Sequence, residues 1–316
     1  MTAVNDRLIS VIAPAMNEQD NIPKLCAVIK AAMNSADIPY ELIIVDDGSQ
    51  DATWAAVCCE AQKDPNVRGI SFSRNFGKES AIFAGLAESK GACAAVIDSD
   101  LQFPPETLCE MYRLWNSGSC ELVEGRKNAR QKETLTYKLF SKTFYKLLKG
   151  MSGIDLDNMC DFKLMDRCIV DTLNSLPEKQ TFFRALSDWP GYRKETVPFD
   201  VADRNSGSSK FTPVKLVKLA LGAISSFSAA PLQLITGAGC VSLALAAVLS
   251  VFTLCFPFAQ HGNELFCWTA AILLALSGIL MIGMGITGYY MARIYEEVKG
   301  RPRWIIGRRT PKSDRT

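Results

Sequence analysis

The sequence predicts an α/β fold with a doubly wound, mostly parallel sheet, followed by interfacial helices and a two-helix transmembrane hairpin. Over the first 130 residues, apolar runs alternate with amphipathic stretches, and such alternation of strand and helix is typical of a parallel sheet. Further on, Glu264 is the only formal charge among the 74 residues between Lys218 and Arg293. This composition excludes a wholly soluble enzyme, an intrinsically disordered chain and a polytopic transporter.

The alternation assigns five strands and four helices to the first part of the chain. Strands are expected where short apolar runs end in polar residues, and helices where apolar positions recur every three or four residues. The expected strands cover residues 8–14, 41–47, 67–71, 93–98 and 120–126. The expected helices cover residues 21–32, 52–62, 78–88 and 105–115. Ligands of doubly wound sheets bind at the carboxyl ends of the strands, so the residues there are the site candidates.

Charge and cysteine usage narrow the class of protein. The net charge is +2 and the basic residues of the first domain are dispersed, so no surface for nucleic acid is expected. The eleven cysteines include no Cys-x-x-Cys, and several lie in apolar runs, as expected for buried thiols of a reducing compartment.

Two acidic residues end the fourth expected strand. Asp98 and Asp100 flank a single residue and can direct carboxylate oxygens at a divalent cation, and Gln102 adds an amide oxygen. No glycine-rich phosphate loop follows the first strand, so metal and side chains must hold any phosphates. Mg²⁺ or Mn²⁺ bridging a diphosphate is the expected occupant. A plain turn or helix cap is the alternative, because another Asp-x-Asp occurs at residues 155–157.

Further motifs accompany these residues in a fixed order. Pro14 with Asn17-Glu18, then Asp46-Asp47-Gly48-Ser49, then Asp98-Ser99-Asp100 together resemble glycosyltransferase family 2, the inverting GT-A fold. The resemblance extends over essentially the whole chain. Within the family, the sequence is most similar to the polyprenyl-phosphate glycosyltransferases, which include dolichyl-phosphate mannose synthases and bactoprenol glucosyltransferases. The motifs similar to that group are Ser73-Arg74-Asn75-Phe76-Gly77-Lys78-Glu79, Gly125-Arg126, Asp161-Phe162-Lys163-Leu164, Phe183-Arg184-Ala185-Leu186, and Arg204 with Gly207-Ser208-Ser209-Lys210.

The resemblance implies a role for each motif. It places the metal and the donor diphosphate on Asp98, Asp100 and Gln102, and it makes Asp100 and Asp161 the candidate catalytic residues. The nucleotide of a UDP-sugar is expected on Pro14, Asn17, Glu18, Asp47, Arg74, Lys78 and Asp98. The role of Asp161 stays open, because a lipid monophosphate, with a second pKa of about 6, hardly needs a base near neutral pH. Orientation of the sugar or acceptor, or capping of a turn, are the alternatives.

A basic segment begins at Arg126. Over residues 134–149, lysines alternate with apolar residues at helical spacing, which predicts an amphipathic helix at a membrane interface; a solvated basic face is the alternative. The resemblance implies that Arg126 and Ser141 bind the acceptor phosphate, with Lys138 near the place of a second arginine that this chain lacks. Arg204 and Lys210 are further candidates for phosphate binding.

Two uncharged stretches, residues 231–256 and 265–292, are each long enough to cross a bilayer. Lysines and arginines lie before the first and after the second, but not in the connector at 257–264, which predicts that both ends are cytoplasmic. The expected organisation is a cytoplasmic domain at 1–210, an interfacial helix at 211–228, the hairpin within 229–292 and a basic tail at 293–316, all at the bacterial plasma membrane. Two buried helices of a globular core are the alternative reading.

Small residues in the second stretch permit close helix packing. Gly283, Thr287 and Met291 share one face, and the family resemblance includes oligomeric members, so a homo-oligomer such as a tetramer is expected. The alternative is that the glycines only loosen a lipid-facing helix.

The expected function is transfer of one glucose from UDP-glucose to undecaprenyl phosphate, with inversion, for modification of a cell-envelope glycan. The same chemistry with GDP-mannose or with a UDP-linked formylated aminoarabinose is the alternative. A catalytically inactive membrane scaffold is the hypothesis from a different class, and the presence of Asp98, Asp100, Gln102 and Asp161 argues against it.

Overall fold

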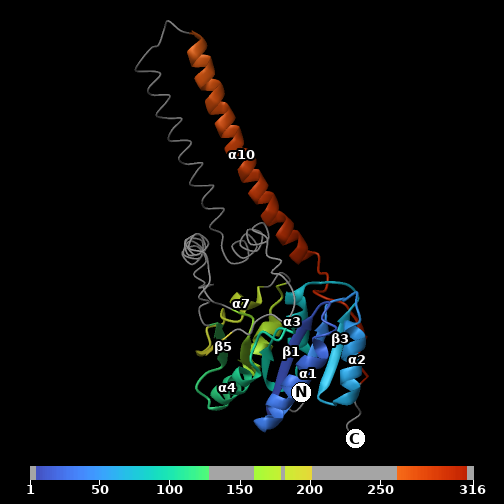
Figure 1. The fold of residues 1–316 in the computed structure, drawn as a ribbon. Coiled ribbons are helices and arrows are strands. Elements are labelled where there is room, and N and C mark those ends of the chain that lie inside the picture. Colours follow the sequence, from blue (N-terminus) through green and yellow to red (C-terminus); the bar gives the residue numbers. More distant parts are fainter. Residues whose placement is uncertain (1–4, 128–159, 179–181, 201–261, 312–316) are drawn as a thin grey trace. The chain divides into compact units, whose positions relative to one another are not determined.

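The computed structural model describes residues 5–127, 160–178, 182–200 and 262–311 (Figure 1). The chain divides into two compact units. The first comprises Met1–Tyr145, Ile154–Lys210 and Pro302–Thr316, and the second comprises Lys146–Gly153 and Phe211–Arg301. Every candidate site residue that the structure describes lies in the first unit.

The first unit is built on one mixed, mostly parallel sheet with the strand order β7-β5-β6-β4-β1-β2-β3-β8. Its strands are β1 (Asn5–Ala15), β2 (Tyr40–Asp46), β3 (Val67–Phe72), β4 (Gly91–Val96), β5 (Leu122–Lys127), β6 (Lys163–Asp166), β7 (Lys194–Phe199) and β8 (Ile306–Arg309). Neighbours β4, β1, β2 and β3 are parallel, as are β5 and β7, whereas β6 and β8 run antiparallel to their partners. The five expected strands and the α/β class are confirmed.

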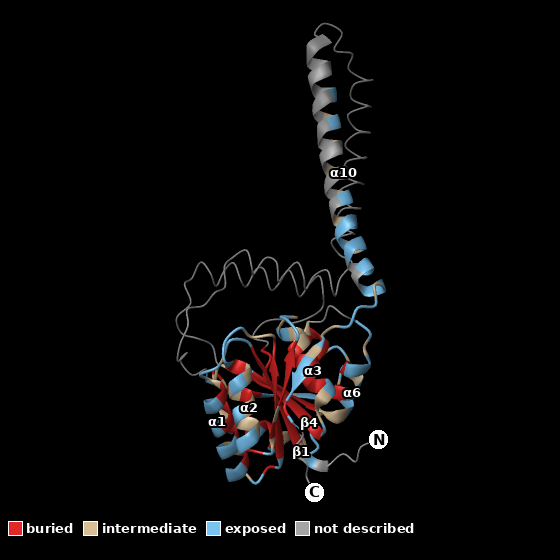
Figure 2. Cartoon of the chain, turned by 90° about the vertical axis from the view of Figure 1, so that its right-hand side faces the viewer, coloured by how far each residue is buried: buried red, intermediate tan, exposed pale blue. Residues whose placement is uncertain are grey.

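Helices cover both faces of this sheet. They are α1 (Ile22–Ser35), α2 (Thr53–Lys63), α3 (Lys78–Glu88), α4 (Pro105–Asn116), α6 (Arg167–Ser175) and the short α7 (Phe183–Leu186). Figure 2 shows the buried strands between α1 and α2 on one side and α3 and α6 on the other. In α1 the buried residues Ile22, Leu25, Cys26, Ile29 and Met33 recur at helical spacing, which gives the helix one apolar face toward the sheet. The four expected helices are confirmed within three residues at each end.

The tail contributes an unexpected strand. Residues Ile306–Arg309 form β8, which pairs antiparallel with the edge strand β3. Beside the strand, Trp304 stacks on Phe72 with ring centroids 6.5 Å apart, and the Arg309 guanidinium pairs with the Glu88 carboxylate at 2.8 Å. The described part of the tail is therefore built into the sheet of the first unit.

The second unit is described only from Gly262 onward. There α10 (Gly262–Val298) is a helix of 37 residues that contains the expected second span. The expected first span at 231–256 and the interfacial helix at 211–228 lie outside the described residues. Within the described residues, no helix is both long and apolar enough to cross a membrane. The two-span hairpin stays a prediction.

Candidate active site

The loop after β4 carries the Asp-x-Asp motif at the carboxyl edge of the sheet. The Ser99 hydroxyl donates to the Pro14 carbonyl at 3.0 Å, which ties the loop to the end of β1. The Asp100 carboxylate accepts a hydrogen bond from the Gln102 backbone N–H at 3.2 Å. Leu101 between them has φ of +60°, a left-handed conformation that is unusual for a bulky side chain. The loop is thus held in one strained shape at the point where two parallel strands end.

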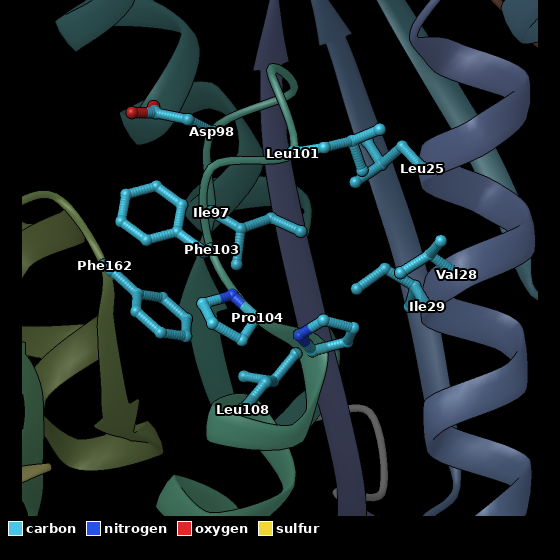
Figure 3. Close-up of a pocket in the computed structure, with 11 residues that line it drawn as sticks. Leu25, Val28, Ile29, Ile97, Asp98, Leu101, Phe103, Pro104, Leu108 and Phe162 are labelled. Carbon is cyan, nitrogen blue, oxygen red and sulfur yellow. The ribbon is translucent and has the colours of Figure 1, made fainter. Parts of the chain in front are cut away.

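An apolar pocket under this loop explains how that shape is kept. The side chains of Leu101 and Phe103 turn inward among Leu25 and Val28 of α1 and Phe162. In Figure 3 the Asp98 carboxylate points away from these side chains. Burial of apolar surface therefore offsets the strain at Leu101 and leaves Asp98 directed out of the core.

Gln102 is the third expected cation ligand, and within the described part of the chain its amide nitrogen is left with an open hydrogen-bonding position beside the Asp-x-Asp loop. The residue is 8% exposed, and its Nε2 atom has no hydrogen-bond partner among the described residues. A buried amide NH₂ without an acceptor is costly, so a phosphate oxygen or water is expected beside Nε2, whereas a cation would bind the Oε1 oxygen of the same amide. The described residues contain no group of three His, Cys, Asp or Glu side chains that could hold a metal alone. A Mg²⁺ ion bound at Asp98 and Asp100 would therefore need substrate phosphates and water as further ligands.

Asp47 after β2 organises the neighbouring loop. Its carboxylate accepts hydrogen bonds from the backbone N–H groups of Phe76 and Gly77 at 2.7 and 3.0 Å. Burial raises the pKa of Asp47, although those two hydrogen bonds oppose the shift. At Gly48 the φ is +68°, and an added Cβ would lie 2.4 Å from the Arg74 carbonyl carbon, so glycine is required. The loops after β2 and β3 therefore form one unit.

The loop after β1 completes the acidic edge. The Asn17 side-chain oxygen accepts from the Gln50 N–H at 3.0 Å, and the Glu18 N–H donates to the Thr53 hydroxyl at 2.8 Å. Burial raises the pKa of Glu18, and the nearby charges of Asp100, Asp51 and Asp98 add to the increase. The structure thus brings Glu18 near the Asp-x-Asp motif, as expected from the parallel strand ends. Their predicted contacts with a nucleotide stay predictions.

Asp161 lies at the centre of a charged cluster. It is 4% exposed, and the Arg184 guanidinium donates to both of its oxygens, at 2.7 and 3.1 Å. The Lys78 ammonium lies 2.6 Å from Asp161 Oδ2 and 2.5 Å from Asp98 Oδ1. Burial alone would raise the pKa of Asp161, but Arg184 and Lys78 outweigh it and hold that pKa far below its usual range. Asp161 is therefore a permanently ionised carboxylate rather than a ready proton acceptor.

Two further residues fix the position of Arg184. The Glu79 carboxylate on α3 accepts a hydrogen bond from the Phe183 N–H at 2.8 Å, at the start of α7. On the other side, the fully buried Lys163 ammonium donates to the Arg184 carbonyl at 3.0 Å and to the Ser187 hydroxyl at 2.8 Å. Burial raises the pKa of Glu79 to about 7. The helix that carries Arg184 is thus held from both ends.

Arg184, Glu79 and Lys163 all belong to the motifs that resemble the family, but the sequence alone assigns a role to none of them. One signal could have found Arg184. Asp161 follows Cys160 and precedes Phe162, an apolar setting that predicts burial, and a buried carboxylate requires a cationic partner. Neither sequence separation nor periodicity indicates which arginine supplies it.

The acceptor-phosphate candidates are only partly described. Arg126 is exposed near the end of β5. Arg74, a candidate for the nucleotide rather than the acceptor, is also exposed, with its guanidinium 4.2 Å from the centre of the Phe76 ring. The other four candidates, Lys138, Ser141, Arg204 and Lys210, lie outside the described residues. The acceptor-binding set stays a prediction.

The fold and the site together define a class of protein. A mixed, mostly parallel sheet with acidic loops and paired aspartates at its carboxyl edge is the GT-A-like arrangement of nucleotide-sugar transferases. Among solved structures, glucosyl-3-phosphoglycerate synthase from Mycobacterium tuberculosis, in complex with phosphoglyceric acid, matches with a TM-score of 0.50 and 21% identity over 70% of this chain and 80% of that chain. This likeness concerns the fold alone.

The chain belongs to glycosyl transferase family 2, whose model matches residues 10–173. It is 36% identical to an uncharacterized glycosyltransferase of Synechocystis over 94% of each chain. It is also 35% identical to the SfII prophage-derived bactoprenol glucosyl transferase of Shigella flexneri, over 94% of this chain and 97% of that protein. The chain is therefore a glycosyltransferase with relatives named for a bactoprenol acceptor, as the motifs predict.

Proposed function

We propose that this protein transfers one glucose residue from UDP-glucose to undecaprenyl phosphate. The observation that carries the proposal is the near full-length similarity to a bactoprenol glucosyl transferase, which extends well beyond the family model into the uncharged C-terminal segments. The geometry around Asp98, Asp161 and Lys78 supports the same conclusion, because it provides fixed charges for a diphosphate and a sugar, and Asp161 is not a proton acceptor near neutral pH.

The chemistry is a single displacement. A phosphate oxygen of the acceptor attacks the anomeric carbon while the bond from that carbon to the UDP oxygen breaks on the opposite side, so the configuration inverts. No base is needed, because the acceptor phosphate is already deprotonated near neutral pH, with its second pKa at about 6. The ionised Asp161 instead orients the sugar and stabilises positive charge that develops at the anomeric carbon.

In this proposal the donor diphosphate binds at the Asp-x-Asp loop. Asp98, Asp100 and Gln102 would hold Mg²⁺ or Mn²⁺, which neutralises the charge on the departing UDP when bound. Lys78 lies beside Asp98 and adds a further positive charge within reach of the same phosphates. Burial would lower the pKa of Lys78, but Asp98 and Asp161 raise it overall, so its ammonium stays charged.

The proposed setting is the cytoplasmic face of the bacterial plasma membrane, with residues 231–256 and 265–292 crossing it as a hairpin. Pairing of β8 with β3 supports this topology, because the chain leaves the first unit after Lys210 and re-enters it at Pro302. A segment that begins and ends in one folded domain must cross a membrane an even number of times. The absence of Lys and Arg from residues 257–264 supports two crossings.

The test is a donor panel with the full-length protein in detergent and undecaprenyl phosphate as acceptor. UDP-glucose, GDP-mannose and the UDP-linked formylated aminoarabinose are supplied separately, and the lipid product is identified by mass spectrometry. We expect product with UDP-glucose, with the anomeric configuration inverted by NMR. Product with another donor alone would overturn the choice of glucose, and no consumption of any donor would favour the scaffold hypothesis.

A further inference from the structure

Lys78 occupies the place on Asp98 that a divalent cation would need. The residue begins α3, and its ammonium bridges Asp98 Oδ1 at 2.5 Å and Asp161 Oδ2 at 2.6 Å. Its backbone is held in place, because the Asp47 carboxylate accepts hydrogen bonds from the N–H groups of both preceding residues, Phe76 and Gly77. The bridge therefore belongs to a folded loop, and it places a cation on a predicted metal ligand.

Asp98 and Asp161 differ in how well their charges stay compensated if the Lys78 ammonium moves away. Asp161 keeps the two hydrogen bonds from Arg184, so its buried charge stays compensated. The side chain of Asp98 is 28% exposed, against 6% for Asp161, so Asp98 can exchange one cation for another at lower cost. Arg184 is a rigid fork fixed on one partner, whereas a lysine is a point charge on a flexible stem that can move between partners.

We propose that Lys78 is an internal cation that competes with the divalent metal for Asp98 and moves to the donor diphosphate when metal and nucleotide bind. An ammonium and a divalent cation on the same carboxylate repel each other at contact distance, so binding of one weakens binding of the other. The diphosphate supplies new negative charge for the displaced ammonium. Lys78 thus weakens metal binding when no nucleotide is present. Binding of the metal and binding of the nucleotide each strengthen the other. The diphosphate part of this proposal rests on the proposed function; the competition with metal does not.

The first test measures Mn²⁺ binding to the full-length protein in detergent without nucleotide, by the electron paramagnetic resonance signal of free Mn²⁺. Lys78→Met should bind Mn²⁺ about tenfold more tightly than the wild type. Lys63→Met is the matched control, because it also removes a lysine from a 2.6 Å ion pair, with Glu60 on the exposed end of α2, and should leave Mn²⁺ affinity unchanged. Equal or weaker Mn²⁺ binding by Lys78→Met overturns the proposal.

The second test separates competition from misfolding. Lys78→Gln removes the charge but keeps a donor for Asp161, so it should fold like the wild type by circular dichroism and show the same gain in Mn²⁺ affinity. In Asp98→Asn, the additional change Lys78→Met should bring no gain. A gain that persists without the Asp98 carboxylate would place the effect elsewhere and refute the assignment.

The third test concerns the diphosphate. At saturating Mn²⁺, UDP should bind Lys78→Met about tenfold more weakly than the wild type, measured by calorimetry. Unchanged UDP affinity would refute movement of Lys78 to the diphosphate. None of these measurements uses a sugar or a lipid acceptor, so a different donor sugar in the panel would leave them intact.

Discussion

At the scale of single residues, the ionisation of Asp161 decides which mechanism the site can support. A general base must exchange a proton near the working pH. Arg184 and Lys78 hold the pKa of Asp161 far below that range, so its charge is constant throughout. The contribution of this pairing to stability is present above the unfolded pKa of about 3.9 and is lost only as the pH falls toward the lower folded pKa.

Replacing Asp161 with Asn should therefore lower the rate without changing its pH dependence. The variant keeps the shape of the side chain but removes the charge that orients Arg184 and the sugar, and we expect a loss of about 100-fold or more in kcat. Rates of wild type and variant are compared between about pH 5.5 and 8.5. If the wild-type profile has an acidic limb that Asp161→Asn abolishes, Asp161 is a base and our interpretation is wrong.

Glu79 ionises within the physiological pH range. Burial raises its folded-state pKa from 4.5 to about 7, so the folded protein binds a proton that the unfolded chain has released. Stability from this group is full below about pH 4.5 and declines as the pH rises through 7. Glu79→Gln keeps an acceptor for the Phe183 N–H and should make stability less dependent on pH over that window, by on the order of 1 kcal/mol. Denaturant melts at several pH values measure this; parallel curves for both proteins would contradict the assignment.

At the scale of elements, the loops are fixed by backbone contacts that local sequence only partly reveals. Gly48 and Gly118 both have positive φ, +68° and +77°, but an added Cβ at Gly48 would meet the Arg74 backbone at 2.4 Å, whereas Gly118 has open space. The first glycine joins two loops of the site, and the second only turns the chain after α4.

These two glycines form a matched pair for a stability measurement. Gly118→Ala should lower the free energy of unfolding by about 1 kcal/mol, because alanine is strained in a left-handed conformation. Gly48→Ala should lower the free energy of unfolding by more, roughly 2–4 kcal/mol, because the backbone of the facing loop must also shift. Chemical denaturation gives both values. Equal losses would mean that the contact between the loops carries no strain energy, and that the loops after β2 and β3 adjust freely.

The same distinction explains what sequence analysis predicted and what it missed. The strands up to β5 and helices α1 to α4 were predicted because each carries its own periodicity. Strands β6 and β8 are four residues each and are defined by antiparallel partners far along the chain, so no local pattern marks them. Asp98 and Asp100 could be proposed as site residues from sequence because they follow a predictable strand. The pairing of Asp161 with Arg184 could not be predicted, because the two residues are 23 positions apart and only the tertiary fold brings their side chains to within 2.7 Å.

At the scale of the whole molecule, β8 links the C-terminal tail to the glycosyltransferase domain. Without β8, the edge of β3 would present unpaired backbone groups and the face of Phe72 that Trp304 now covers. The tail was expected to be only a basic cytoplasmic segment. Its place in the sheet gives it a structural role, and it keeps Ile306–Arg309 on the same side of any membrane as β3.

The constraint leads to a prediction about topology. If the domain that contains β3 is cytoplasmic, a fusion after Thr316 must be cytoplasmic too, because Ile306–Arg309 cannot pair with β3 across a bilayer. Green fluorescent protein fused there should fluoresce in a bacterial host, and alkaline phosphatase fused there should be inactive. The control is alkaline phosphatase inserted in the connector at 257–264, which should be active outside the membrane. An active phosphatase after Thr316 would exclude the hairpin, because it would put β8 and its partner strand β3 on opposite sides of the membrane. An inactive phosphatase in the connector would also exclude it, because the turn between the two spans would then not lie outside.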